Sequence, residues 1–426
     1  MKFAKFVYTL LVLVLLYIYL HNPIMSNGFG SCKILYIFAI LYIGFNAHRF
    51  SQYISLFKKE FVLLLILIVY SAFEFLNTGE PNTVRLHIVG LMEYFVLPFF
   101  IISCIKASDS ENRGSLIKYM LIIGCVGAII TTACVSSPSI NEYIRTTFNK
   151  AVLASTDDYR ANTMYRGFGI SETLTYSYGI IQGMFFVIAL FYLKQNRWVL
   201  PITFFILLSA ALNARTGILV AAIGLIMYFI YSKKNRTFLV AVSLFIIVLF
   251  NLSAIFNFIG VSAQTLDWLS LFMNEADSIF TNASLTASDT TSYMFKDMLI
   301  FPRDVSEWLV GCGYDVYYLH EGRRSDLGWI IQLNFGGIPY LLLELTLLCY
   351  MYKRLKKRGF KNLAMFFAIA FIISNTKGPV LPNSGMFRFI MLFYIYYIMY
   401  SKEMIEYSTA STRFMNNKKI SVKKNL

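Results

Sequence analysis

The chain has 426 residues, of which 57% are hydrophobic, 17% aromatic and only 14% charged. With a mean hydropathy of +0.60, this composition excludes an ordinary soluble domain and is typical of a polytopic membrane protein. The formal net charge of +15 is spread over separate segments beside apolar runs, so anionic membrane lipids are the expected partners and nucleic acid is not.

Apolar runs long enough to cross a bilayer, about 17–25 residues or slightly fewer, recur about twelve times. No small-residue cleavage site follows the first run, so we interpret it as a span and not as a signal peptide. The sequence therefore predicts an all-α polytopic membrane protein that forms a single integral membrane domain over residues 1–426. The predicted spans are 4–20, 31–46, 61–76, 86–105, 117–135, 176–193, 199–212, 218–231, 237–260, 327–350, 362–374 and 386–400.

The distribution of Lys and Arg predicts the orientation of these spans, because cytoplasmic loops retain basic residues. If the N-terminus is inside, the N-terminal end, the alternate connections and the tail contain 25 of the 38 Lys and Arg residues. Both termini are then cytoplasmic, and the basic tail 401–426 is a solvated cytoplasmic end.

Two of the outer connections are long, 136–175 and 261–325. Loops of this length are uncommon unless they carry function or disorder. In the second loop, apolar residues recur at helical spacing from Leu266 to Phe280, before a Ser/Thr-rich break. This pattern predicts two enlarged outer loops that carry short amphipathic helices on the membrane surface.

Arg215 lies in the turn 213–217 between two unusually short apolar runs, and so at or slightly below the outer interface. A guanidinium fork at this depth is suited to bind phosphate or pyrophosphate bidentately, which Lys does less well. The alternative is an arginine at the end of a span that snorkels to the interface.

The first long loop contains Arg160, and then Arg166 and Glu172 shortly before the next span. Glycines at 167 and 169 flank this arginine, and they let the backbone approach a bulky ligand closely. The stretch is therefore a candidate for substrate binding. The alternative is an ordinary Gly-containing loop with a solvated charge.

The second long loop ends in a cluster of ionisable residues around its one histidine, His320. The cluster also contains Glu321, Arg323, Arg324 and Asp326. A base that deprotonates a hydroxyl group would be His320 near neutral pH, or a carboxylate whose pKa is raised by partial burial. The alternative is a solvated charge cluster.

Further ionisable residues fall inside spans or in a short outer loop, where they are functional candidates, with interhelical pairing as the alternative. They are Glu74, Glu93, Glu344, Lys377 and Arg388. Five of the six cysteines lie in or beside apolar runs, which predicts packing and not a disulfide or metal framework. No soluble-enzyme or metal motif is present, so no metal and no cofactor is expected.

Several short motifs resemble those of the O-antigen ligase and polymerase superfamily in their order and spacing. The stretch 212–219 resembles its arginine turn, and the later stretches resemble the end of its large loop and the following span. With about twelve spans and two enlarged loops, the resemblance covers nearly the whole chain. The other motifs are Arg166-Gly167-Phe168-Gly169, Gly311-Cys312-Gly313, Ser325-Asp326-Leu327-Gly328-Trp329, Asn334-Phe335-Gly336-Gly337-Ile338-Pro339 and Asn375-Thr376-Lys377-Gly378-Pro379.

The resemblance implies a Wzy-type polysaccharide polymerase of O-antigen or capsule biosynthesis. Such a membrane glycosyltransferase, GT-C-like and metal-independent, transfers a growing glycan from undecaprenyl pyrophosphate to a sugar hydroxyl of an incoming lipid-linked repeat unit. It acts at the outer face of a bacterial cytoplasmic membrane, and its expected partners include a chain-length regulator and a flippase.

By the resemblance, Arg166 and Arg215 hold the donor pyrophosphate. Ligases of the superfamily often have a histidine just before the span where this chain has Ser325 and Asp326. Asp326 is therefore the first candidate for the base, followed by His320 and Glu321. The further candidates for substrate binding are Arg160, Arg323, Arg324, Lys377 and Glu172.

Two other functions remain as alternatives. A ligase of the same superfamily transfers finished glycan to lipid A or another acceptor. A flippase or other transporter of lipid-linked oligosaccharides also has about twelve spans, but transporters usually place polar residues along a central pathway and contain internal repeats. Here the polar candidates gather at one face, and the sequence shows no repeat.

Overall fold

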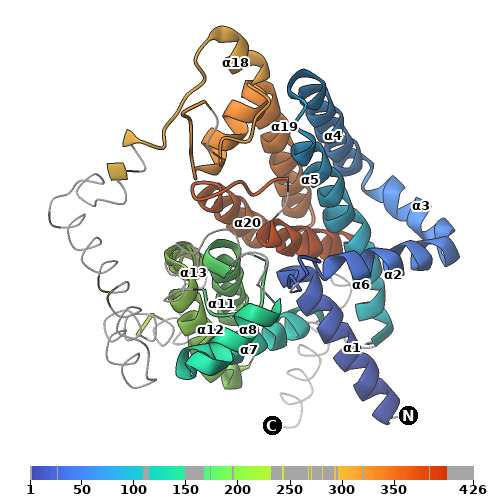
Figure 1. The fold of residues 1–426 in the computed structure, drawn as a ribbon. Helices are drawn as coiled ribbons and strands as arrows, with labels where there is room; N and C mark the ends of the chain where they lie inside the picture. Colours follow the sequence, from blue (N-terminus) through green and yellow to red (C-terminus); the bar gives the residue numbers. More distant parts are fainter. Residues whose placement is uncertain are drawn as a thin grey trace, which may run out of the picture.

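The computed structural model describes residues 2–25, 27–108, 115–148, 167–172, 174–193, 196–231, 296–318, 321–382 and 384–400, and between 232 and 295 only residues 242, 243, 267, 270, 281, 292 and 293. Within this part of the chain the secondary structure is helical, as predicted, apart from one isolated bridge between Ile24 and Gly30. Figure 1 shows that the helices run in several directions and pack against one another.

The helices, in chain order, are α1 (Lys2–His21), α2 (Cys32–Phe45), α3 (Ala47–Leu56), α4 (Lys58–Thr78), α5 (Pro81–Leu91), the π turn η1 (Met92–Val96), α6 (Leu97–Ser108), α7 (Ser115–Ser136), α8 (Pro138–Phe148), the π turn η2 (Leu174–Tyr178), α11 (Gly179–Leu193), the 3₁₀ turn η3 (Arg197–Val199), α12 (Leu200–Asn213), α13 (Arg215–Tyr231), α18 (Val305–Val310), α19 (Gly328–Lys357) and α20 (Lys361–Ser374). A last helix, Gly385–Tyr400, follows α20.

Six helical stretches are long and apolar enough to cross a membrane. They are Phe3–His21, Lys58–Thr78, Pro81–Ser108, Leu116–Ser136, Tyr176–Leu193 and Gly328–Lys357. The pair α2 and α3 would make a seventh, although the two helices are bent by 102° to each other. Four shorter apolar helices, α12, α13, α20 and the last helix, add to these. The chain is thus a membrane-embedded, all-helical protein.

Eleven of the twelve predicted spans coincide with described helices, and the remaining one, 237–260, lies almost wholly outside the described residues. The predicted span 31–46 corresponds to α2, which has 14 residues. At 1.5 Å per residue it reaches about 21 Å, less than the roughly 30 Å of a hydrocarbon core. The number of complete crossings therefore stays a prediction.

The long apolar stretch from Pro81 to Ser108 contains a π turn because of a proline. Pro98 has no N–H to donate to the carbonyl of Tyr94, and its ring crowds that carbonyl in an ordinary helix. The turn η1 widens the helix just before it, and there the Leu97 N–H bonds to the Met92 carbonyl. Glu93 lies in this turn, and π turns of this kind are frequent at functional sites.

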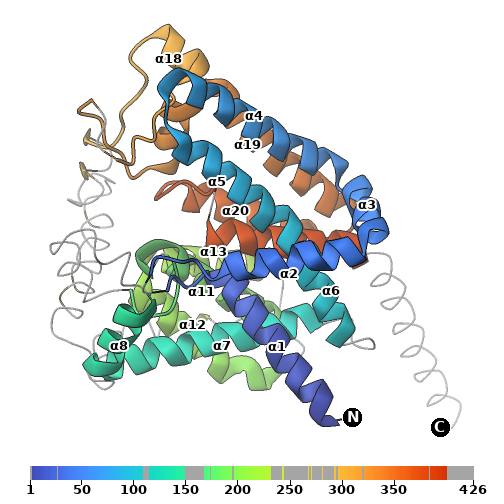
Figure 2. The same ribbon diagram turned by 45° about the vertical axis from the view of Figure 1, so that its right-hand side comes forward.

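The last helix is buried on almost all sides and runs through the middle of the molecule (Figure 2). Its aromatic rings contact rings of neighbouring helices, Phe389 with Phe185 of α11 and Phe387 with Tyr94 of η1. A helix that is apolar on all faces is expected inside a bundle. Its one arginine, Arg388, is fully buried.

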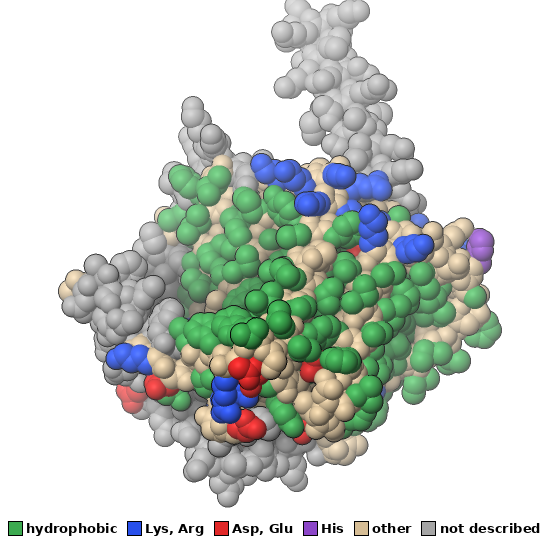
Figure 3. Space-filling model, turned by 90° about the horizontal axis from the view of Figure 1, so that it is seen from above, with side chains coloured by type: hydrophobic (Ala, Val, Ile, Leu, Met, Phe, Trp, Pro, Cys, Tyr) green, Lys and Arg blue, Asp and Glu red, His purple; other side chains and the backbone are tan. Residues whose placement is uncertain are grey.

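Basic helix ends gather at one end of the bundle. Arg354 near the end of α19 donates to Glu60 at the start of α4 at 2.5 Å. The Lys59 ammonium lies over a tyrosine ring of α19, and the Lys106 ammonium lies 5.0 Å from the ring of Tyr400. Figure 3 shows an apolar band between an edge rich in Lys and Arg and an edge with both charges.

The opposite end, which we name the polar end, is formed by residues 167–172, 213–217, 311–318, 321–328, 375–382 and 384. Residues of the helices that follow two of these segments contact the turn after α20. The Trp329 N–H bonds to the Asn375 carbonyl at 3.2 Å, and the Tyr176 hydroxyl donates to the Gly378 carbonyl at 2.9 Å. Segments that the sequence predicts on the outer side are thus neighbours in the structure.

The loop after α18 is held on a break in α19. Helix α19 loses its helical geometry at Gly336 and Gly337, just before Pro339. The N–H groups of Cys312 and Gly313 donate to the carbonyls of residues 334 and 335 at 2.6 and 2.9 Å. In both Figures 1 and 2, α18 lies beside the ends of α4 and α5. Two motifs that lie apart in the sequence therefore form one unit.

Gly313 has φ +74°, and a Cβ added at this position would lie 2.4 Å from Thr78 and 3.0 Å from Glu74. We expect Gly313→Ala to detach this loop and destabilise the protein by more than the roughly 1 kcal/mol of a left-handed alanine. Gly322→Ala is the matched control, because Gly322 has φ +78° and nothing within 4 Å. Thermal unfolding in detergent measures both. An equal loss at the two positions would mean that the crowding at Gly313 has no energetic effect.

Candidate functional site

Asp326, the first candidate for the base, lies at the polar end directly before α19. Its Oδ2 is 3.7 Å from Nζ of Lys377, and the two side chains are 28% and 43% exposed. Gly328 allows this approach, because a Cβ there would lie 2.5 Å from the Gly378 carbonyl oxygen. The structure thus brings together two predicted site residues, a carboxylate and an ammonium, both accessible to solvent.

Glu321 and Arg323 belong to a second group of charges on the loop. Glu321 is exposed and bonded to Arg303 at 2.9 Å. Arg323 is buried, and it donates to Glu307 at 2.8 Å and to Asn334 at 3.3 Å. Arg323 is therefore an internal support of the loop, engaged by a carboxylate that the sequence analysis missed. Arg324, the next predicted substrate ligand, is exposed.

The carboxyl groups of this loop differ in their environment. Desolvation raises the pKa of Glu307, but hydrogen bonds from the Arg303 backbone and the Arg323 guanidinium outweigh it, so this pKa lies below its ordinary value. Burial raises the pKa of Asp315, and a bond from the Tyr317 N–H only partly offsets the increase. Asp315 is thus a further carboxyl group of the polar end, absent from the predicted site residues.

Arg215 begins α13 directly after a break in the chain. Helix α12 ends at Asn213, and Ala214 is extended, with φ −157° and ψ 134°. Gly217 approaches the carbonyl of Gly179 so closely that a Cβ would lie 2.3 Å from its oxygen. The predicted turn between two short helices is therefore present. A guanidinium in the first turn of a helix adds to the positive end of the helix dipole, which favours an anion.

The segment after Arg166 is hydrogen-bonded to this turn. The Phe168 N–H donates to Oδ1 of Asn213, and the Thr131 hydroxyl donates to the Phe168 carbonyl at 2.8 Å. The two predicted arginine motifs are thus adjacent through residues 167 and 168. Arg160, Arg166 and His320 themselves lie outside the described residues.

Arg145 of α8 is a buried arginine that the sequence analysis missed. Its guanidinium donates to Oδ1 of Asn141 at 3.2 Å and to the Gly167 carbonyl at 3.4 Å. Asn141 and Arg145 are four residues apart on a helix with a strongly amphipathic sequence. That spacing places them on one face of the helix, and it is the signal that would have indicated them.

Glu172 is part of a buried charge triad. Its carboxylate accepts from Nη2 of Arg388 and from the Asn22 amide. Arg388 also donates to Glu93 at 2.5 Å, and the exposed fraction of its side chain is zero. For Glu93 and Arg388, the alternative of interhelical pairing is the arrangement observed. The carboxylate of Glu172, predicted to bind substrate, is occupied by groups of the protein.

The other intramembrane carboxylates have different surroundings. Glu344 accepts from the Gln332 amide at 3.0 Å, and Gln332 in turn accepts from Asn375 at 2.6 Å. Glu74 is buried beside Gly313, at the edge of the docked loop. Glu74 is thus near the docked loop, and Glu344 is linked through Gln332 to Asn375 at the polar end.

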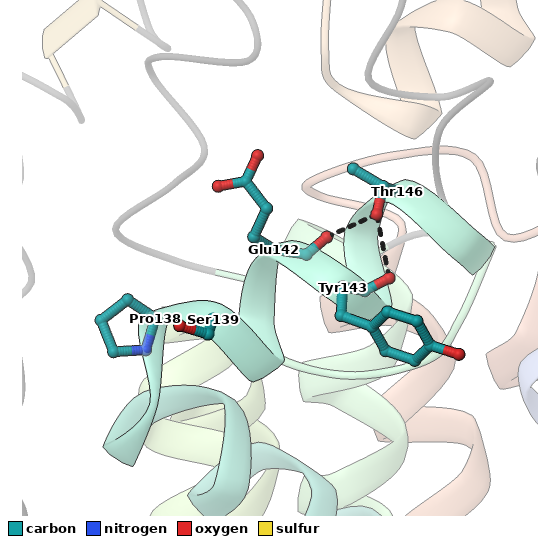
Figure 4. A pocket seen from close by; sticks show the side chains of 5 residues that line it. All are labelled: Pro138, Ser139, Glu142, Tyr143 and Thr146. Carbon is teal, nitrogen blue, oxygen red and sulfur yellow. Dashed lines mark hydrogen bonds between the residues drawn. The ribbon is translucent and has the colours of Figure 1, made fainter.

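The surface hollow in Figure 4 is lined by Pro138, Ser139, Glu142, Tyr143 and Thr146 of α8. The Thr146 hydroxyl bonds only to backbone carbonyls of its own helix, at 2.8 and 3.1 Å. None of the predicted site residues that the structure describes lines this hollow. It is therefore separate from the candidate site, which consists of groups distributed over the polar end.

Comparison with protein-family models, with curated proteins and with solved structures finds no match to this chain. Among the described residues, no three His, Cys, Asp or Glu side chains are grouped so that they could hold a metal ion. The site is therefore interpreted from its own chemistry, which is that of arginines, an ammonium and carboxylates at one end of a membrane bundle.

Proposed function

We propose that this protein is a membrane glycosyltransferase that polymerises lipid-linked oligosaccharide repeat units, of the Wzy type. The observation that carries the proposal is the convergence at the polar end. The segment after Arg166 is hydrogen-bonded to the Arg215 turn, and Tyr176 of η2 bonds to Gly378, directly after Lys377 of the Asp326–Lys377 pair. A donor with a lipid pyrophosphate needs cationic groups at the membrane surface, and an acceptor hydroxyl needs a base.

In the proposed reaction, the acceptor hydroxyl oxygen attacks the anomeric carbon of the donor glycan. The bond from that carbon to the pyrophosphate oxygen breaks, and the hydroxyl proton passes to the base. Arg215 and Arg166 stabilise the charge that develops on the leaving pyrophosphate. Because pyrophosphate is a good leaving group, no separate general acid is required. A single displacement inverts the anomeric configuration.

The proposed location is a bacterial cytoplasmic membrane, with the polar end outside and the basic helix ends in the cytoplasm. We expect the cysteine of Tyr318→Cys, as the single cysteine of the chain, to react with a membrane-impermeant thiol reagent in intact cells. The cysteine of Lys356→Cys should react only after the membrane is opened, because position 356 lies among the basic residues that cytoplasmic loops retain. Labelling in the reverse order would exclude transfer at the outer face.

The proposal requires Arg215 to bind pyrophosphate. Arg215→Lys keeps the charge but loses the bidentate grip, so we expect kcat/KM for the lipid-linked donor to fall about 10- to 100-fold. Arg85→Lys, at an exposed position of α5, is the control and should retain turnover. Purified protein and a synthetic lipid-linked repeat provide the assay, in which polymer length is read on a gel. Equal activity of the two variants would remove Arg215 from the site.

The base is tested by comparing Asp326→Asn with His320→Ala in the same assay. We expect Asp326→Asn to lose about 10²- to 10⁴-fold in rate, the usual effect of removing a general base. His320→Ala should retain more activity. Full turnover by Asp326→Asn beside an inactive His320→Ala would assign the role to the histidine. Full turnover by both would direct the search to Glu321 or Asp315.

The same assay separates the two alternative functions. A ligase would transfer glycan to lipid A or another acceptor and would form no ladder of repeats. A transporter would move the lipid-linked substrate without forming a new bond. The break in α19 does not favour a transport site, because the carbonyls of residues 334, 335 and 336 are already bonded to the loop and to Tyr70.

A further inference from the structure

The Glu93–Arg388–Glu172 triad joins two side chains on helices to a third side chain, that of Glu172, which lies outside any helix. Arg388 comes from the last helix and Glu93 from the π turn η1, and their closest atoms are 2.5 Å apart. The other oxygen of Glu93 accepts from the Tyr36 hydroxyl of α2 at 2.7 Å. Helix packing therefore satisfies this ion pair without any contribution from Glu172.

Glu172 belongs to the segment 167–172, which contains no helix. Its side chain is 14% exposed and is held by Arg388 and Asn22. Its backbone N–H donates to the His21 carbonyl at 2.9 Å, and the Ser171 hydroxyl donates to the same carbonyl at 3.1 Å. One end of the segment is thus fixed to the end of α1 and to the central helix.

The other end of the segment is fixed to the Arg215 turn, through Phe168 and the buried side chains of Asn213 and Thr131. Glu172 lies four positions after Phe168, so the chain between the two attachments spans at most about 14 Å. A change in the attachment at Glu172 is therefore transmitted to the backbone beside the arginine turn.

Two carboxylates share one guanidinium, so the triad carries a formal charge of −1 when all three groups are ionised. Removing Arg388 would leave two buried carboxylates without a cation, which is strongly destabilising. Neutralising Glu172 leaves the complete Glu93–Arg388 pair in place. The core therefore does not need the charge of Glu172 for its stability, although Arg388 in the core binds this carboxylate.

We propose that Glu172 is a positioning residue, which anchors the segment 167–172 to Arg388 and so holds its backbone against the Arg215 turn. This role rests on the proposed function for its catalytic consequence, but not for the anchoring itself. It differs from direct substrate binding, in which the carboxylate would contact a sugar hydroxyl.

The test compares Glu172→Gln with Glu93→Gln, which remove the same charge from the same guanidinium. Hydrogen exchange measured by mass spectrometry follows the amides of residues 167–172 in the purified full chain. Glu172→Gln should accelerate their exchange about tenfold, the loss of one charge-assisted bond. Glu93→Gln should leave these amides within about threefold of the wild type, and thermal unfolding shows whether both variants are folded.

In the polymerisation assay, Glu172→Gln should lower kcat/KM for the donor about tenfold or more through misplacement of the arginine turn, and Glu93→Gln should not. Unchanged exchange in Glu172→Gln would overturn the anchor, and a loss of turnover without faster exchange would identify Glu172 as a substrate ligand instead. Equal acceleration of amide exchange in both variants would also overturn the anchoring role of Glu172. If exchange responds as expected while the wild type forms no polymer, the anchor stands and only the proposed function fails.

Discussion

The guanidinium of Arg388 has no exposed surface, so its charge has to be neutralised by other groups inside the bundle. The two carboxylates that neutralise it lie 295 and 216 residues away in the sequence. One comes from a π turn that a proline induces, and the other from a segment without regular structure. Arg388 therefore joins the central helix, the π turn and the segment 167–172.

The polar end depends on a second constraint, close approach of backbones. Gly311, Gly328 and Gly337 each stand where a Cβ would lie 2.1 to 2.7 Å from a carbonyl oxygen of another segment. These glycines belong to the motifs on which the resemblance to the polymerase superfamily rests. Gly311 and Gly337 let the loop after α18 contact the broken helix α19, and Gly328 lets the start of α19 contact Gly378. The glycines of these motifs therefore determine how the backbone packs at the polar end, and the charged residues lie on that backbone.

Much of this was accessible from the sequence. Apolar runs predicted the helices, because burial in lipid requires continuous apolar stretches with internal hydrogen bonding. The bend after α2 was not predicted, since the polar sequence of α3 indicates only that the span ends. The pairings of Arg323 with Glu307 and of Glu172 with Arg388 also escaped prediction, because a charge in a loop has the same local signature whether it binds substrate or another segment.

These pairings also bear on where chemistry can occur. Several polar groups inside the bundle are bonded to other groups of the protein: Arg388 to two carboxylates, Glu344 to an amide, and the carbonyls of the α19 break to the docked loop. A pathway through the bundle would need such groups open to a passing ligand. The Asp326–Lys377 pair, in contrast, keeps 28% and 43% of its two side chains exposed. The carboxylate and the ammonium of this pair therefore contact each other and are also within reach of a ligand at the surface, as the proposed transferase would require.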